Sequence, residues 1–111
     1  MTDTGTIAKI HHFATFKKGW HYTEGEVFEQ SVLDKAVDLA EYATGLEFET
    51  DAFPGTGGGV MITLYWDDFD CDFSIHIDGT WTFCRQNKDC EVYQEGLSFQ
   101  DAKDKIKGLM K

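Results

Sequence analysis

The stretch from residue 69 to residue 77 alternates strictly between apolar and polar side chains, and no other feature of the sequence restricts the fold as strongly. The apolar positions are Phe69, Cys71, Phe73, Ile75 and Ile77, and the polar ones are Asp70, Asp72, Ser74 and His76. Successive side chains in a β-strand point to opposite faces of a sheet. The pattern therefore predicts a strand with one face in the core and the other in water.

Four further segments have strand character, at residues 46–52, 60–66, 80–85 and 90–95, and short connections join all five. Asp78-Gly79 is the residue pair that a two-residue type I′ hairpin prefers, because both of its central positions need a positive φ. Parallel neighbours would need long crossover connections. The five strands are therefore predicted to form an antiparallel meander.

Three helices complete the predicted fold, two before the strands and one after them. Residues 4–18 have apolar positions at helical spacing, although the β-branched and aromatic content of residues 7–16 leaves a strand as the alternative. Residues 29–44 carry an apolar stripe and are followed by Gly45, a typical helix terminator. Ser98 and Asp101 form a near capping box that predicts the start of the last helix.

The order of these elements predicts an α+β protein with helices packed on one face of an antiparallel sheet. The expected architecture is two N-terminal helices, a five-stranded antiparallel meander and a C-terminal helix packed on one sheet face. A chain of 111 residues with 41% apolar and 14% aromatic residues suffices for one packed core. Residues 1–111 are therefore predicted to form a single domain.

Negative charge is concentrated in the middle of the chain. Between residues 20 and 95, 17 Asp and Glu residues are opposed by Lys35, Arg85 and Lys88, a net charge of −14. The flanking segments 1–19 and 96–111 each carry +2, which leaves −10 for the whole chain. Such a field repels nucleic-acid phosphates and anionic membranes and attracts basic protein surfaces. Direct binding of nucleic acid or of a membrane is therefore not expected.

The cysteines and the N-terminal segment indicate a reducing compartment. Cys71, Cys84 and Cys90 form no CxxC pair, and an odd number of thiols fits reduced cysteines better than a disulfide framework. The first residues lack the long apolar stretch of a secretory signal, and no apolar run approaches the roughly 20 residues that span a bilayer. A cytoplasmic protein is expected.

The wet face of residues 69–77 is the leading candidate for a functional surface. The predicted partner-binding residues are those of this face and its surroundings: Asp67, Asp68, Asp70, Asp72, Trp66 and Glu91. A divalent-metal site at Asp70, Asp72 and His76 is the alternative, since hard cations prefer clustered oxygen ligands. A solvated face is favoured, because one open strand cannot surround an ion. No metal or other cofactor is predicted.

Aromatic residues near this face are candidates for contact with a partner. Tyr65, Trp66 and Trp81 would be rigid anchors if they lay on the wet face among the acids. Burial in the core is an equally weighted alternative, because large residues usually lie inside.

No arrangement of residues predicts catalysis. The run Gly55 to Gly59 is not followed by Lys-Ser/Thr, and the next element is a predicted strand, so a hairpin loop is favoured over a phosphate cradle. The four histidines lie in no motif that combines a nucleophile, a base and an orienting group. The protein is therefore predicted not to be an enzyme.

Several local motifs together resemble those of a loose set of small bacterial and phage-borne proteins. They are Gly19-Trp20-His21-Tyr22 with a second Gly25, the helix with Leu33, Ala36 and Val37, a Gly-rich turn before an apolar strand, Asp78-Gly79, and the closing run Leu97 to Ala102. The likeness covers most of the chain. It implies the architecture and transfers no ligand or catalytic residue.

Charge and size together favour a small acidic, non-enzymatic binding protein that inhibits a basic protein target. Immunity proteins, antitoxins and phage anti-defence inhibitors of nucleic-acid-handling proteins share these two properties, and the comparison is an analogy. One alternative is a small domain that acts through oligomerisation, for example as a homodimer. A divalent-metal binder is the other.

Overall fold

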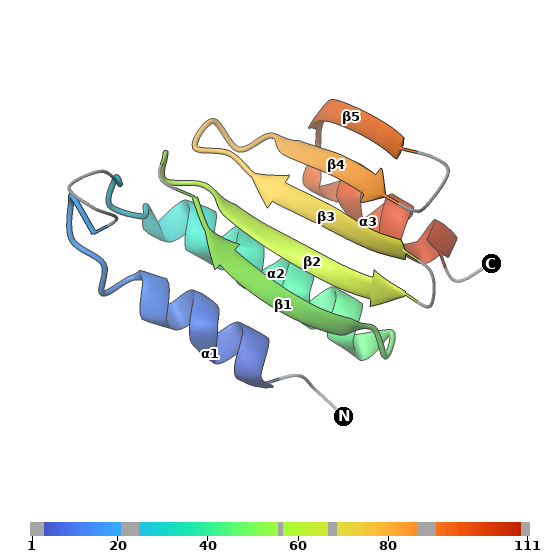
Figure 1. Cartoon of the computed structure of the whole chain (residues 1–111), viewed down its shortest axis with the longest axis horizontal. Helices are drawn as coiled ribbons and strands as arrows, with labels where there is room; N and C mark the ends of the chain where they lie inside the picture. Colours follow the sequence, from blue (N-terminus) through green and yellow to red (C-terminus); the bar gives the residue numbers. More distant parts are fainter. Residues whose placement is uncertain (1–3, 21–24, 56, 67–68, 87–90, 110–111) are drawn as a thin grey trace.

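The computed structural model shows three helices and a five-stranded sheet (Figure 1). It describes residues 4–20, 25–55, 57–66, 69–86 and 91–109, with the backbone alone at Thr4, Trp66, Phe69, Gln86, Glu91, Val92 and Leu109. The elements in chain order are α1 (Thr4–Phe13), α2 (Gln30–Gly45), β1 (Glu49–Pro54), β2 (Val60–Trp66), β3 (Phe69–Ile75), β4 (Trp81–Gln86), β5 (Glu91–Leu97) and α3 (Phe99–Leu109).

The strands follow one another across the sheet in chain order, and every neighbouring pair is antiparallel. Helix α2 lies across β1, β2 and β3, and α3 lies across β4 and β5 on the same side of the sheet (Figure 1). Helix α1 runs along the outer side of β1 and also contacts α2. The predicted α+β class and antiparallel meander are confirmed.

The core lies between α2 and the middle of the sheet. The helix contributes Val32, Leu33, Ala36, Leu39, Ala40 and Ala43, and the central strands β2 and β3 contribute Val60, Ile62, Leu64, Cys71, Phe73 and Ile75. Alanine side chains are small, so the backbone of α2 can approach the sheet closely.

None of the helices in the described part of the chain has the length and apolar character that a membrane span requires.

Helix α3 begins at the capping box that the sequence predicts. The backbone N–H of Asp101 donates to the Ser98 hydroxyl over 3.1 Å, and the N–H of Ser98 donates to the Asp101 carboxylate over 3.1 Å. Two N–H groups that the helix cannot satisfy internally are thereby paired. Ala102 and Ile106 then face the core and are fully buried.

Helix α1 is shorter than the sequence pattern suggests. It ends at Phe13 instead of continuing to residue 18, and the N–H groups of Ala14, Thr15 and Phe16 donate to carbonyl oxygens three residues earlier. The aromatic rings of Phe13, Phe16 and Phe28 then pack together with Trp20. This aromatic contact turns the chain before the expected stop at Gly19. The strand alternative for residues 7–16 is wrong.

Strand β1 begins three residues later than the pattern predicts, because α2 ends in a Schellman motif. The N–H of Phe48 donates to the carbonyl oxygen of Ala43 over 3.1 Å, and the N–H of Glu47 donates to that of Thr44 over 2.9 Å. This geometry needs a left-handed residue, and Glu47 takes that role with φ 70°. Gly45, the predicted terminator, is instead the last residue of the helix.

The connection between β3 and β4 is not the predicted two-residue hairpin. Its N–H groups at His76 and Gly79 donate to the carbonyl oxygens of Thr80 and His76, respectively. Gly79 has φ 88°, but Asp78 has no positive φ. The Asp78 carboxylate instead accepts from the N–H and the hydroxyl of Thr80 over 2.9 and 2.7 Å. Strand β3 consequently ends at Ile75, and Ile77 belongs to the turn.

The two margins of the sheet differ. Strand β1 has α1 beside it, whereas β5 lies at the opposite margin and pairs with β4 alone among the described elements (Figure 1). The pairing of β5 with β4 shifts register between Trp81 and Phe83, and Gly96 has φ 72°. Such an irregularity bends an edge strand and interrupts its ladder.

We predict that Glu47→Gly raises the free energy of unfolding. A non-glycine residue in the left-handed region costs roughly 1–2 kcal/mol, and glycine loses about 0.5–1 kcal/mol more backbone entropy on folding, so a gain of about 0.5–1 kcal/mol is expected. Urea denaturation measures it. Glu47→Ala, which removes the charge but keeps the side-chain constraint, is the control. An equal gain in both variants would contradict the backbone explanation.

Candidate functional site

The side of the sheet away from α2 and α3, termed the open face below, is the candidate site. It carries alternate residues of each strand, and the register aligns them in rows. One row holds Glu49, Tyr65 and Asp70, the next holds Asp51, Thr63, Asp72, Cys84 and Tyr93, and a third holds Phe53, Met61, Ser74 and Thr82. Acids therefore gather toward one end of the face, and apolar side chains toward the other.

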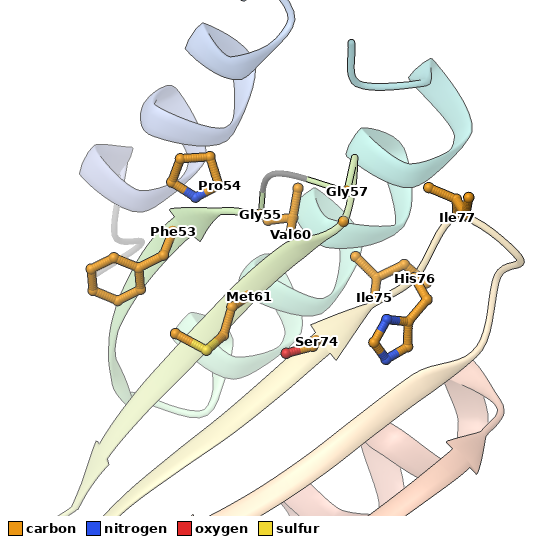
Figure 2. Close-up of a pocket in the computed structure, with 11 residues that line it drawn as sticks. Phe53, Pro54, Gly55, Gly57, Val60, Met61, Ser74, Ile75, His76 and Ile77 are labelled. Carbon is orange, nitrogen blue, oxygen red and sulfur yellow. The ribbon is translucent and has the colours of Figure 1, made fainter. Parts of the chain in front are cut away.

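A groove of about 410 Å³ lies at the apolar end. Figure 2 shows Phe53, Met61, Ser74 and His76 spread across the ends of β1, β2 and β3, with Ile77 at one side. Phe53 is 36% exposed and Ile77 is 62% exposed, which is unusual for side chains of this size. The groove is therefore an apolar surface in contact with water.

Glycines allow the backbone to come close at this end of the sheet. A Cβ at Gly59 would lie 2.7 Å from the carbonyl oxygen of Ile75, and Gly58 has φ 92° and would meet the side chain of Ile77 at 3.2 Å. The N–H of Gly55 donates to the carbonyl oxygen of Gly59 over 2.8 Å. The Gly-rich run joins β1 to β2, as favoured in the sequence interpretation.

The imidazole of His76 is tied to the neighbouring strand beside the groove. Its Nε2 lies 2.6 Å from the hydroxyl of Thr82 on β4. This contact places the ring on the open face next to Ser74 (Figure 2). The groove wall thus combines apolar side chains with one polar ring.

At the acidic end, four carboxylates act on one phenol. Burial raises the pKa of Tyr65 above its ordinary value of 10.0, and nearby negative charges raise it further; these belong to Asp51, Asp70, Asp72 and Glu49. A negative neighbour disfavours the phenolate. The effect on this side chain of β2 indicates that acids from the two neighbouring strands, β1 and β3, share one region of the open face.

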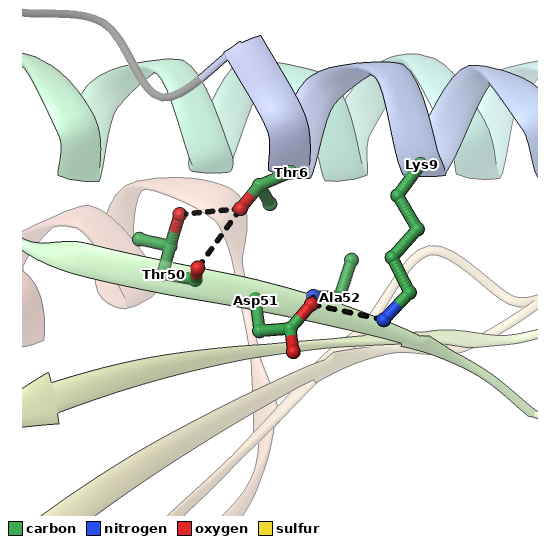
Figure 3. Close-up of polar contacts among 5 residues, drawn as sticks. All are labelled: Thr6, Lys9, Thr50, Asp51 and Ala52. Carbon is green, nitrogen blue, oxygen red and sulfur yellow. Dashed lines mark hydrogen bonds and ion pairs between the residues drawn. The ribbon is translucent and has the colours of Figure 1, made fainter.

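Two of these acids have partners within the protein. Figure 3 shows Lys9 of α1 reaching Asp51 on β1, with 2.9 Å between its Nζ and the carboxylate. The same Nζ lies 4.6 Å from the ring centroid of Phe53, a cation–π distance. Thr63 donates its hydroxyl to Asp72 over 2.8 Å across the β2–β3 pair. These contacts orient the carboxylates on the face.

The same helix also occupies the outer side of β1. Thr6 donates its hydroxyl to the carbonyl oxygen of Thr50 over 2.9 Å, and Thr50 donates its hydroxyl to that of Thr6 over 2.9 Å (Figure 3). The N–H of Ala52 donates to the Asp51 carboxylate over 2.7 Å, and Pro54 has no N–H. Side chains and a proline thus take the place of a further strand at this margin.

The residues that the structure describes give little support for a metal site or for a reactive thiol. Among them, no group of three or more His, Cys, Asp and Glu side chains could hold a metal ion. Burial raises the pKa of Cys71 to about 11, so its reactive thiolate is scarce near neutral pH. Cys84 is half-buried on the open face.

Comparison of the chain with protein-family models, with curated proteins and with solved structures gives no match.

Some of the residues predicted from the sequence lie on the open face, and others lie outside the part of the chain that the structure describes. Asp70 and Asp72 lie on the open face, as predicted. Asp67 and Asp68 fall outside the described residues, and for Trp66 and Glu91 the structure describes the backbone alone, at the end of β2 and the start of β5. The aromatic candidates divide as well: Tyr65 lies on the open face, but Trp81 faces the core and is fully buried.

Sequence reasoning missed Glu49 and Asp51 in the acidic group and Phe53 and Met61 in the groove. Alternation in residues 49–53 carried the relevant signal, because Thr50 and Ala52 are buried while their neighbours face outward. The strand was predicted to start at residue 46, so the alternation that begins at Glu49 was not recognised. The groove itself depends on the register of three strands, which no single segment encodes.

We predict that Asp70→Asn with Asp72→Asn lowers the pKa of Tyr65 toward 10.0, because two of the charges that disfavour the phenolate are removed. Titration of ¹³C-labelled tyrosine by NMR measures the change. Asp34→Asn with Asp38→Asn on the exposed side of α2 removes the same charge elsewhere. An equal shift in this control would indicate a general charge effect and contradict a local cluster.

Proposed function

We propose that this chain is a non-enzymatic binding protein that presents the open face of its sheet to a basic protein surface and thereby inhibits that protein. The observation that supports the proposal is the coincidence, on one uncovered face, of a carboxylate cluster with exposed apolar and aromatic side chains. Immunity proteins, antitoxins and phage-encoded inhibitors are analogues in charge and size.

The charge of the face suits a basic partner. Glu49 and Asp70 are exposed, and Asp72 is half-buried beside them. Opposite potentials steer partners together and accelerate their association. A surface of this sign also disfavours nucleic acid, so the partner is a protein even where that protein itself handles nucleic acid.

Exposed aromatic side chains would supply the desolvated part of the contact. Tyr65 and Tyr93 are 36% and 59% exposed, and both belong to the rows that carry the acids. Aromatic residues surrounded by polar ones are typical of the residues that dominate binding energy. The acids then contribute mainly to the rate and specificity of association.

Binding to a basic probe tests the proposal. The probe is a fluorescein-labelled peptide in which Lys and Ser alternate, and its affinity is expected to fall as ionic strength rises. The triple variant Glu49→Gln, Asp70→Asn, Asp72→Asn is expected to bind about tenfold more weakly, at roughly 0.2–1 kcal/mol for each lost pair. Fluorescence anisotropy measures the affinity.

The matched control changes three exposed acids on the outer side of α2: Asp34→Asn, Asp38→Asn and Glu41→Gln. It alters the net charge by the same amount on a different surface. The proposal fails if this control weakens binding as much as the open-face variant does, or if wild-type binding does not respond to salt.

A further inference from the structure

We propose that the groove at the apolar end of the open face receives one apolar side chain of the basic partner, whose segment runs along β3 with its cationic side chains over Asp72 and Asp70. This inference rests on the proposed function and specifies its ligand. The partner would be recognised by an extended segment in which an apolar residue precedes alternate Lys or Arg residues.

Binding of a partner would remove the apolar surface of the groove from water. Five large apolar side chains of the described chain are at least 36% exposed, and they are Val27, Phe53, Tyr65, Ile77 and Tyr93. Two of them, Phe53 and Ile77, line this one groove together with Met61 (Figure 2). A gathered patch of this kind is typical of an interaction site, whereas scattered apolar residues are ordinary.

The spacing of the groove and the acids along β3 defines the spacing in the ligand. Ser74 lies at the groove, Asp72 two residues away and Asp70 four residues away on the same face. A strand rises about 3.3 Å per residue, so the carboxylates lie roughly 7 and 13 Å from the groove. An extended ligand matches these distances with cations two and four residues from its apolar side chain.

The protein itself contains an example of the proposed recognition. Lys9 places its ammonium 2.9 Å from the Asp51 carboxylate and 4.6 Å from the centre of the Phe53 ring beside the groove. An ammonium is therefore accommodated between an open-face acid and an aromatic wall of the groove. A lysine of the ligand would use Asp72 in the same manner on the neighbouring strands.

A second copy of the chain is disfavoured as the occupant. The chain carries a net charge of −10, and two open faces in contact would place like-charged carboxylates near one another. Like charges brought together in an interface repel one another and weaken the association. A basic segment instead neutralises the acids while it fills the groove.

Two peptides of identical composition test the inference. In acetyl-Leu-Ser-Lys-Ser-Lys-Ser-amide, Leu and both Lys side chains point to one side of an extended chain. In acetyl-Leu-Lys-Ser-Lys-Ser-Ser-amide the Leu side chain points to one side and both Lys side chains point to the other. The first peptide is expected to bind about tenfold more tightly, because the partial burial of one Leu side chain supplies a factor of that size. Fluorescence anisotropy with labelled peptides measures the ratio.

Substitutions in the groove test whether it causes the difference in affinity between the two peptides. Ile77→Ser and Met61→Thr are each expected to reduce the ratio between the peptides toward one, while Val27→Ser, an equally polar change at an exposed apolar residue outside the groove, retains it. Thermal unfolding identifies any variant that does not fold. Because two groove variants and two peptides are compared, the loss of one variant does not remove the test.

The outcomes separate this inference from the proposed function. Equal affinity for both peptides, with binding still weakened by Asp70→Asn and Asp72→Asn, overturns the groove and leaves the acidic face. If those substitutions do not weaken the affinity for either peptide, the proposed function is overturned. Sedimentation equilibrium that shows a wild-type dimer abolished by Ile77→Ser would assign the groove to a second copy and overturn the inference.

Discussion

Helix α2 and strands β2 and β3 bury one another's apolar side chains, and the remaining elements are placed relative to that contact. Ala36, Ala40 and Ala43 hold the helix backbone close to the sheet, so the sheet is covered on this side along its middle. The alternation in β3 then puts Asp70 and Asp72 on the other side. The open face is thus a direct consequence of covering one side of a meander by helices.

The character of the open face arises from register more than from the composition of any one strand. Antiparallel pairing aligns Tyr65 with Glu49 and Asp70, and it aligns Met61 with Phe53 and Ser74. Acids and apolar side chains that are mixed along the sequence become separated into two ends in space. A charged end and an apolar end on one surface are suited to a ligand that carries both kinds of side chain.

Where local chemistry determines structure, the sequence was a reliable guide. Strand β2, helix α2 and the capping box of α3 follow from side-chain periodicity and short-range hydrogen bonding, and they lie within one residue of their predicted bounds. The start of β1 was missed because Glu47 adopts a left-handed conformation that glycine normally provides. The groove and the contact of Lys9 with Asp51 join segments far apart in the chain, so no local pattern could reveal them.

The unequal margins of the sheet limit how these molecules can assemble through their backbones. Hydroxyl and carboxylate groups and Pro54 take up hydrogen-bonding positions along the outer side of β1, so addition of a strand there is obstructed. Only the β5 margin remains for such pairing among the described elements. Two molecules that joined through β5 would each turn a blocked margin outward, and the growing sheet would stop at two copies. The fold therefore disfavours the continuous edge-to-edge addition of sheets that builds fibres.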